Sequence, residues 1–178
     1  MRSGLRKGVF SLEKSGFFNS NNGDRIYDAT DFASYFGDLV SNGIFYINAD
    51  NLKVTAAAGM TVVVAPGSAW INGYHYENTT PLDLAIATAN GVNPRIDRIV
   101  VQWSNVNREI RLAVKTGTPT QVPIAPELTR TADTYELGIA DITIPKSAVS
   151  TTDDMVSDTR LNSNLCGLVN SLVSAVYE

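Results

Sequence analysis

The sequence predicts a mainly β fold: an antiparallel β-sandwich or barrel-like domain with one N-terminal amphipathic helix and a C-terminal helix. Charged residues make up 18% of the 178 residues, below the ~25% that is typical of globular domains. Short apolar or alternating segments, separated by Gly, Pro, Asn and Asp, fill the stretch from residue 43 to residue 144. Helical spacing of apolar residues is confined to one segment near each end of the chain.

The chain divides into three parts on this interpretation. Residues 1–27 form an extended arm, with a turn at Asn22-Gly23. Residues 28–152 form the β-rich domain, led by a helix over 28–43, and residues 153–178 form a linker and the C-terminal helix. At 19.2 kDa the chain is long enough to bury a sizeable core without disulfides.

The leading helix is predicted by an apolar stripe. Asp28 or Thr30 can accept hydrogen bonds from its first free backbone N–H groups, as an N-cap residue does. Asn42-Gly43 predicts its end, because glycine tolerates the left-handed conformation that is common there. The stripe recurs at i, i+3, i+4, i+7 and i+8 and consists of Phe32, Tyr35, Phe36, Leu39 and Val40.

Strands are expected throughout the middle of the chain. Asn72-Gly73 predicts a type I′ hairpin, because this dipeptide suits the two positive-φ positions of that turn. Residues 104–107 predict a second hairpin, between 98–103 and 108–114. The proline-rich stretch 119–126 is expected to be a loop or an edge crossing, since proline cannot donate to a ladder. The expected strands are 43–47, 52–56, 61–65, 68–71, 74–77, 80–84, 97–103, 109–115 and 135–144.

The C-terminal helix is predicted by a second apolar stripe. A helix this short is marginal alone and needs a partner, which is either its own domain or copies of itself. In the second case it begins a coiled-coil stalk, and all members of the stripe except Val173 are the expected oligomer contacts. The stripe consists of Leu165, Leu168, Val169, Leu172, Val173 and Val176.

Composition excludes several functional classes. The net charge of −4 and the pI of about 5.0 argue against nucleic-acid binding, which needs a basic face. A single cysteine, Cys166, rules out an internal disulfide and a cysteine-based zinc cage, and a single histidine, His75, rules out a multi-histidine metal centre. No run approaches the ~18 apolar residues of a membrane span, and no secretory signal is present. We expect synthesis in a cytoplasm, and no cofactor.

No active site assembles from the sequence. His75, beside a tight turn, is expected to be an exposed or half-packed strand residue rather than a base. The acidic group at Asp153, Asp154 and Asp158 is expected to be a solvated turn or helix N-terminus, and a hydrolase that uses these acids is the least favoured alternative. Cys166 is expected to be a buried, inert thiol. The alternating charges at 95–98 and 157–160 predict ion pairs at strand ends or subunit contacts.

Two groups of aromatic residues are candidates for binding. Phe10, Phe17 and Phe18 are unusual in a solvated arm, and each would bury on the order of 150–250 Å² against a partner surface. Rings of the middle region could instead stack on a sugar, although core and cross-strand packing is the favoured interpretation. These rings are Trp70, Tyr74, Tyr76 and Trp103, of which the first three are the candidate glycan platform.

The order and spacing of several short runs resemble a known family. The N-terminal runs include Ser15-Gly16-Phe17-Phe18-Asn19-Ser20 and continue at 23–29, 31–36 and 42–45. The later runs include Trp70-Ile71-Asn72-Gly73 within 69–74 and continue at 95–100, 115–119, 126–130, 135–137, 158–160 and 166–167. Together they resemble the N-terminal attachment domain of baseplate and tail-fibre proteins from phages of Gram-positive bacteria, including the baseplate upper proteins of lactococcal siphophages.

The resemblance implies a β-rich plug that docks on the phage tail. A helical stalk then carries a receptor-binding head or a partner subunit, often as a trimer. In this chain the terminal helix resembles the start of such a stalk. Tail docking is then expected through the arm and the first helix, at residues that include Phe10, Phe17, Phe18, Arg25 and Tyr27.

We therefore expect a non-enzymatic structural protein of the virion, made in the host bacterial cytoplasm and located in the tail or baseplate. It would anchor a fibre or a separate receptor-binding protein and form a homo-oligomer, with a trimer favoured, and it would bind no nucleic acid and insert in no membrane. The alternative is a carbohydrate-binding module that recognises host surface glycans through Trp70, Tyr74 and Tyr76.

Overall fold

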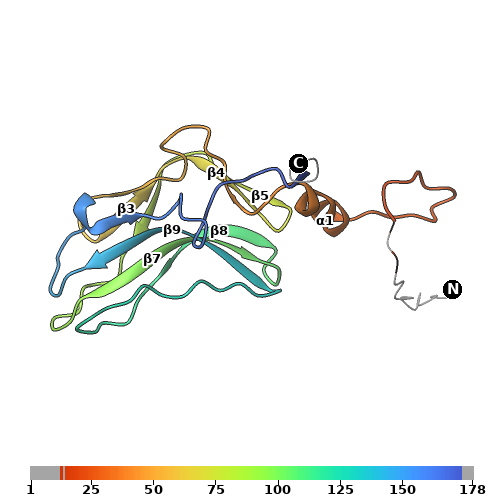
Figure 1. Cartoon of the computed structure of the whole chain (residues 1–178). Coiled ribbons are helices and arrows are strands. Elements are labelled where there is room, and N and C mark those ends of the chain that lie inside the picture. Colours follow the sequence, from red (N-terminus) through yellow and green to blue (C-terminus); the bar gives the residue numbers. More distant parts are fainter. Residues whose placement is uncertain (1–12, 14, 174–178) are drawn as a thin grey trace, which may run out of the picture.

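The computed structural model describes residue 13 and residues 15–173. Within these residues the chain is mainly β, every pair of named strands is antiparallel, and one α-helix is present, α1 (Ala29–Leu39). The strands gather in one body, and α1 and the arm before it extend from one end (Figure 1). The prediction of a mainly β fold with antiparallel sheets is confirmed.

Three sheets form this β body. In Figure 1 the largest sheet lies on one side and the two smaller sheets lie opposite it. The largest has the order β10 (Val156–Asp158), β9 (Thr134–Ile144), β7 (Arg95–Ser104), β8 (Glu109–Lys115). The smaller sheets are β1 (Gly43–Ile44), β4 (Gly67–Ile71), β5 (Tyr74–Asn78) and β2 (Val54–Ala56), β3 (Thr61–Val64), β6 (Leu82–Ala85).

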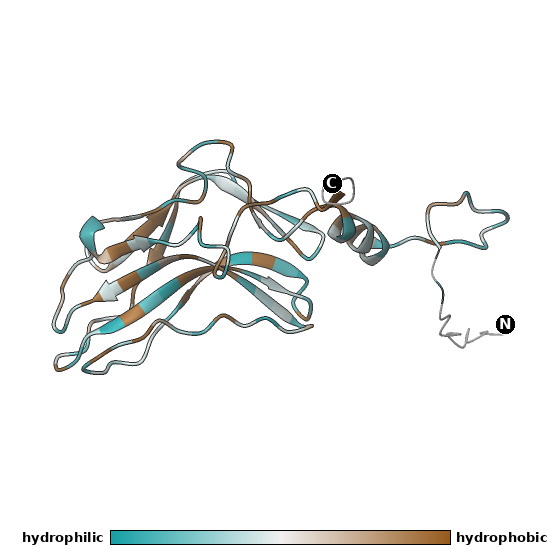
Figure 2. Cartoon of the chain, viewed as in Figure 1, coloured by the Kyte–Doolittle hydropathy of each residue, from teal (hydrophilic) through white to brown (hydrophobic). Residues whose placement is uncertain are grey.

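One apolar core joins the three sheets. Strands β7 and β9 are buried along most of their length, as their near-continuous apolar runs predict for central strands. Apolar residues recur along β3, β7 and β9 in Figure 2. The fully buried side chains come from every sheet and include Ile44, Val62, Val64, Ile71, Ile99, Leu137 and Ile139.

Both predicted hairpins are confirmed. Asn72 and Gly73 connect β4 to β5 with φ angles of 51° and 82°, the positive values that a type I′ turn requires. Strands β7 and β8 pair from Arg98↔Lys115 to Ser104↔Glu109. The proline-rich stretch 119–126 contains no strand. Local turn chemistry therefore fixes these connections.

Buried ion pairs tie long loops to the largest sheet. Arg95 Nε lies 2.9 Å from Asp97 Oδ1, and both side chains are almost fully buried. The Arg95 guanidinium also donates to the carbonyl oxygens of Ala87 and Thr88. Asp97 accepts a further hydrogen bond from the backbone N–H of Gly117 at 2.8 Å. Because a buried charge without partners is costly, this pair holds two loops in place.

Two more arginines act in the same way. Arg98 lies 2.6 Å from Asp141 and donates to the carbonyl oxygen of Pro126 at 2.7 Å. Arg160 lies 2.6 Å from Asp158, and its hydrogen bonds hold the pKa of this carboxyl below the usual value. Arg160 also donates to the carbonyl oxygens of Ala49 and Asn51. The ion pairs predicted at 95–98 and 157–160 are confirmed.

Glu136 is a buried carboxylate on β9. It accepts hydrogen bonds from Lys115 Nζ at 2.6 Å, the backbone N–H of Thr129 at 2.6 Å and Gln102 Nε2 at 2.8 Å. Burial alone would raise the pKa of Glu136, but these hydrogen bonds outweigh it, so the pKa lies below the usual 4.5. Lys115 also donates to the carbonyl oxygen of Glu127 at 2.7 Å, so this network fixes the loop that leads to β9.

The predicted C-terminal helix is wrong for the described residues. Asp153–Met155 form a single 3-10 turn, β10 follows, and residues 159–173 contain no α-helix. Instead the chain runs along β1, where Ile44 donates to the carbonyl oxygen of Gly167 and Val169 donates to that of Ile44, both at 3.0 Å. Gly167 has a positive φ of 80°, which interrupts helical geometry between the first two members of the apolar stripe, Leu165 and Leu168.

The leading helix is shorter than predicted. α1 spans Ala29–Leu39 rather than 28–43, and it starts at a capping box in which Asp28 and Asp31 each bond the other's backbone N–H. Val40 is already extended and bridges Ser171. The rings of the apolar stripe that predicts this helix are exposed, and Ala33 is the buried residue of α1. The stripe is therefore available for contacts outside the core.

The substitution Glu136→Gln is expected to reduce the loss of stability in acid. Because the folded pKa lies below the unfolded value, the contribution of Glu136 is complete above about pH 4.5 and is lost as the pH falls through the folded pKa. Urea denaturation across this range measures the slope of the free energy of unfolding with pH. At neutral pH the variant is expected to lose about 1–3 kcal/mol of stability, since Lys115 loses its charged partner.

The matched control is Glu109→Gln, because Glu109 is an exposed strand residue paired with Arg111 at 3.5 Å. It should keep the slope of the unmodified protein, and Asp158 should leave both variants with some acid sensitivity. An unchanged slope in Glu136→Gln would contradict this account of the carboxylate.

Candidate assembly surface

The arm folds back as a loop before α1 begins. Asn22 and Gly23 turn the chain with φ angles of 56° and 77°, at the predicted position. The Tyr27 hydroxyl donates to the carbonyl oxygen of Phe18 at 3.1 Å and accepts from the N–H of Phe18 at 2.9 Å. These two bonds close the loop between residues that are nine positions apart in the sequence. Residues 15–27 of the arm therefore have a defined shape without a helix or strand.

Phe17 joins the arm to α1. Its ring centroid lies 5.8 Å from that of Tyr27, 5.6 Å from Phe32 and 5.0 Å from Tyr35. Five rings of this region remain 41–59% exposed, although each is large enough to belong in a core. We call them the aromatic surface; they are Phe17, Phe18, Phe32, Tyr35 and Phe36.

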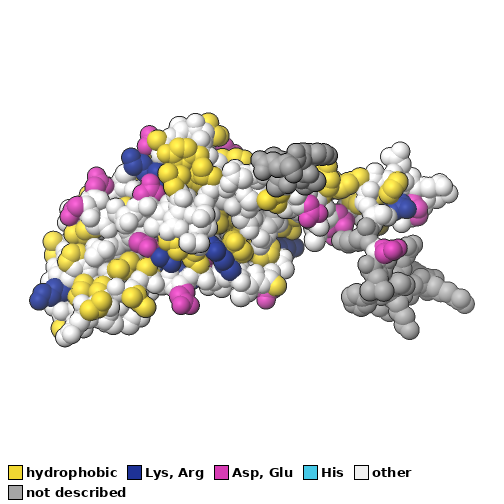
Figure 3. Space-filling view, viewed as in Figure 1, with side chains coloured by type: hydrophobic (Ala, Val, Ile, Leu, Met, Phe, Trp, Pro, Cys, Tyr) yellow, Lys and Arg dark blue, Asp and Glu magenta, His cyan; other side chains and the backbone are white. Residues whose placement is uncertain are grey.

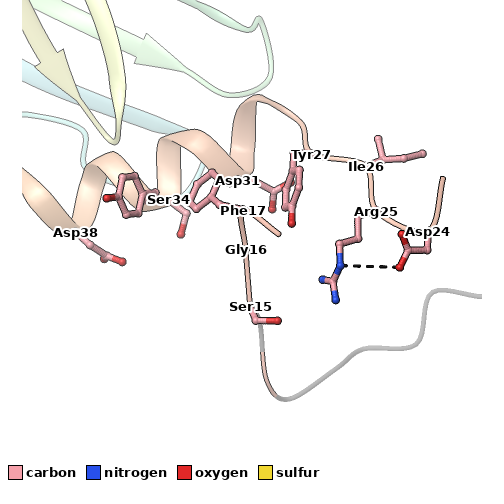
Figure 4. A pocket seen from close by; sticks show the side chains of 11 residues that line it. Ser15, Gly16, Phe17, Asp24, Arg25, Ile26, Tyr27, Asp31, Ser34 and Asp38 are labelled. Atoms are coloured by element: carbon pink, nitrogen blue, oxygen red, sulfur yellow. Dashed lines mark ion pairs between the residues drawn. The ribbon is translucent and has the colours of Figure 1, made fainter. Parts of the chain in front are cut away.

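An open hollow of about 480 Å³ lies between the arm and α1. In Figure 4, Phe17 lies against one end of the helix, Asp31, Ser34 and Asp38 follow the helix, and Asp24 and Arg25 come from the arm. Arg25 lies 4.0 Å from Asp24, and its guanidinium sits 5.3 Å from the centroid of the Phe18 ring. The hollow therefore combines exposed rings with more carboxylates than cations.

α1 is seated on the turn between β4 and β5. A Cβ built on Gly73 would lie 1.9 Å from the carbonyl oxygen of Ala33, so a glycine is needed for this approach. Phe36 meets Trp70 edge-to-face at 5.7 Å. The indole N–H of Trp70 is buried without an acceptor among the described residues, which costs about 1–3 kcal/mol. α1 therefore packs on the hairpin through few contacts, and the buried indole N–H beneath it costs folding free energy.

The structure brings together most of the predicted docking residues. Phe17, Arg25 and Tyr27 line the hollow, and Phe18 lies on the same loop, bonded to Tyr27. Phe10 lies outside the described residues. The arm prediction therefore identified residues that are neighbours in space, as far as the described chain extends.

The predicted oligomer contacts do not form a helical face. Leu168 bridges Ile44 in parallel, and the backbone N–H of Leu172 donates to the carbonyl oxygen of Leu39 at 2.9 Å. Leu165 and Val169 are half-buried in the same irregular segment. Val176 lies outside the described residues. Without a helix over 159–173, helical spacing does not place the described members of this set on one face.

The predicted glycan platform is divided between two faces of the β4–β5 hairpin. Trp70 pairs with His75 across the hairpin, whereas Tyr74 pairs with Ile71 and Tyr76 with Ala69. Since alternate residues of a strand point to opposite faces, Trp70 lies on the face opposite to the two tyrosines. Trp70 meets Phe36 and Phe45, while Tyr74 meets Trp103.

Sequence reasoning missed three members of the aromatic surface. The sequence places Phe32, Tyr35 and Phe36 in the apolar stripe of the helix without marking them as docking residues, and they are 46%, 48% and 41% exposed. One available signal was that these three rings fall within five positions, whereas the core of this chain is mostly aliphatic. Spacing identifies which residues share a helix face, but not what covers that face.

The groups considered for catalysis have structural roles. Asp153 accepts from the backbone N–H of Ala56 at 2.8 Å, and Asp158 pairs with Arg160. His75 is an exposed strand residue 6.1 Å from the Trp70 ring. Burial raises the pKa of the Cys166 thiol to about 12, so the thiol stays protonated at neutral pH. Among the residues that the structure describes, no three His, Cys, Asp or Glu side chains are grouped to hold a metal ion.

The substitution Gly73→Ala is expected to displace α1 from the β body. The added methyl group would collide with the carbonyl group of Ala33, and the φ of +82° strains any residue other than glycine. Displacement of Phe36 would expose Trp70 to water, so tryptophan emission should shift to longer wavelength while the β body stays folded. Fluorescence and thermal unfolding measure the two effects.

Gly91→Ala is the matched control, because a Cβ at that position meets nothing within 4 Å. It should leave the emission unchanged. Identical emission spectra for both variants would contradict the seating of α1 on the turn.

Comparisons with known proteins identify no relative of this chain. No protein-family model, curated protein or solved structure matches the chain. Within the described part of the chain, no helix has the length and apolar character needed to span a membrane. The exposed rings, the hollow beside them and the weakly held helix are therefore the observations on which a functional assignment rests.

Proposed function

We propose that this chain is a non-enzymatic structural protein of a phage tail or baseplate, which anchors a fibre or a separate receptor-binding protein to the tail. The observation that carries the proposal is the aromatic surface, which stands exposed beside a β body whose own core is already complete. Exposed apolar patches of this kind mark protein interaction sites. The tail is proposed as the partner because the order of several sequence runs resembles phage attachment domains.

The area of the aromatic surface is large enough for a specific interface. A phenylalanine or tyrosine buries on the order of 150–250 Å², and about half of each of the five rings is exposed. A partner that covers them would therefore remove ~500 Å² of ring surface from water on this chain alone. With a similar area on the partner, the total reaches the ~1,000 Å² that specific interfaces need.

Two parts of this surface fit two kinds of partner. The loop of the arm extends away from the β body (Figure 1). It bears Phe18 with Arg25 over its ring, and it fits another tail protein. The rings on α1, at Phe32, Tyr35 and Phe36, have the i, i+3, i+4 spacing through which helices pack on copies of themselves. We assign the homotrimer contact to α1 in place of the C-terminal segment, and we assign the β body a sandwich-like architecture.

The charged side chains of the β body also fit a structural role. The arginines and carboxylates that the charge pattern at 95–98 and 157–160 predicts to form ion pairs are engaged in holding loops, so they contribute to the rigidity of the body. In Figure 3 charged groups are dispersed over the visible face of the β body, with hydrophobic side chains between them. A rigid body with a separate adhesive end is what an attachment protein of the virion requires.

The proposal is tested by locating the chain on phage particles. Antibodies against the chain, applied to particles that carry its coding sequence, should label the tail tip or baseplate in negative-stain electron microscopy. On particles whose chain carries both Phe18→Ser and Arg25→Ser, the number of labelled tails should fall roughly tenfold or more. The reason is that truncation of an interface anchor typically costs over 1 kcal/mol of binding free energy. The folded state of the purified variant should be unchanged, since both residues lie outside the core.

Val122→Ser is the matched control, because Val122 is 83% exposed and belongs to a loop of the β body rather than to the arm. It should leave the labelling at the level of the unmodified chain. Label on the capsid, or chain found in the infected cell but not on particles, would overturn the proposed function.

A further inference from the structure

A second hollow lies beside strand β5 of the β4–β5 hairpin, and Trp70 does not line it. Its volume is about 560 Å³, within the range of ~300–1,000 Å³ that small-molecule sites occupy. Three parts of the fold converge on it: strand β5, the turn between β7 and β8, and the first residues of α1. None of its residues belongs to the aromatic surface, so the proposed function does not account for it.

Three aromatic rings line this hollow. Tyr74 and Tyr76 are alternate residues of β5, so their side chains share one face of the strand. Trp103 of β7 lies below them, with its ring centroid 5.9 Å from that of Tyr74 and an interplanar angle of 33°. The tyrosines are half-buried and Trp103 is 9% exposed. Packing against the core therefore fixes the rings before any ligand arrives.

Polar residues complete the lining. The Ser104 hydroxyl accepts from the backbone N–H of Asn107 at 3.1 Å, which shapes the turn between β7 and β8. Burial raises the pKa of the Tyr76 phenol, so its hydroxyl remains a hydrogen-bond donor at neutral pH. The remaining polar residues supply hydroxyl, amide, guanidinium and carboxylate groups; they include Thr30, Asn105, Arg108 and Glu109.

We propose that this hollow binds a neutral saccharide unit. A pyranose has a flat face of C–H groups and an edge of hydroxyl groups, and it matches aromatic rings bordered by hydrogen-bonding side chains. Arg108 and Glu109 carry opposite charges, so the border offers an anionic sugar no excess of cations. The site uses Tyr74, Tyr76 and Trp103, and it therefore differs from the platform predicted with Trp70.

The two tryptophans of this chain make the test internally controlled. In the full chain labelled with ¹⁵N, the indole N–H signals of Trp70 and Trp103 are followed while maltotriose, chitotriose or galactose is added. At least one of these neutral sugars should shift the Trp103 signal in a saturable manner and leave the Trp70 signal in place. Glucuronic acid, the anionic comparison, should produce a weaker shift of Trp103 at the same concentration.

Substitutions then assign the contact. Tyr76→Ala is expected to weaken the binding at least tenfold, and Tyr76→Phe, which keeps the ring, should weaken it less. Tyr46→Ala is the control, since Tyr46 is 43% exposed and does not line the hollow. The proposal is overturned if none of the neutral sugars shifts Trp103, if both indole signals shift together, or if glucuronic acid binds more tightly. This outcome is independent of where the chain is found on a phage particle.

Discussion

Three buried arginines, each paired with a carboxylate, are the constraint on which the rest of this structure depends. Strands β1, β2, β3 and β10 are short, and long loops connect the elements, so strand pairing alone leaves much of the backbone without fixed partners. Arg95, Arg98 and Arg160 each use a carboxylate to balance charge and use their remaining N–H groups to bind loop carbonyls. The loops of the three sheets are thereby attached to one body.

This arrangement separates stability from binding. The β body contains the core, the ion pairs and the network around Glu136, and it contributes few exposed rings. The arm and α1 carry most of the exposed aromatic residues and contribute little to that core. A close approach at Gly73, the contact between Phe36 and Trp70 and the hydrogen bond from Leu172 to Leu39 hold α1 beside the β body. A partner can therefore reposition α1 at little cost to the β body.

Features set by local chemistry could be predicted from the sequence. Asn72-Gly73 determines a hairpin because few other dipeptides accept two positive φ angles. The alternation of apolar and charged residues in β8 indicates one buried and one solvated face. The charge pattern at 95–98 indicates side chains that must be paired when they are buried. In each case a few neighbouring residues contain the whole physical reason.

Features set by distant contacts could not be predicted. The stripe from Leu165 to Val173 has helical spacing, yet β1 supplies hydrogen-bond partners that favour an irregular extended path, and Gly167 permits it. The stripe on α1 indicates one face but not its partner, so its exposure appears only in three dimensions. The division of Trp70 from Tyr74 and Tyr76 follows from strand alternation once the register of the hairpin is known.

The central claim is that the arm and α1 are a weakly held end of an otherwise rigid body. Native-state hydrogen–deuterium exchange of the free protein tests it most directly, because it measures the opening free energy of each amide. The account predicts that the amides of α1 exchange orders of magnitude sooner than those of β7 and β9, whose exchange should follow global unfolding. Exchange of α1 at the same rate as β7 and β9 would show that the helix belongs to the core and would contradict the account.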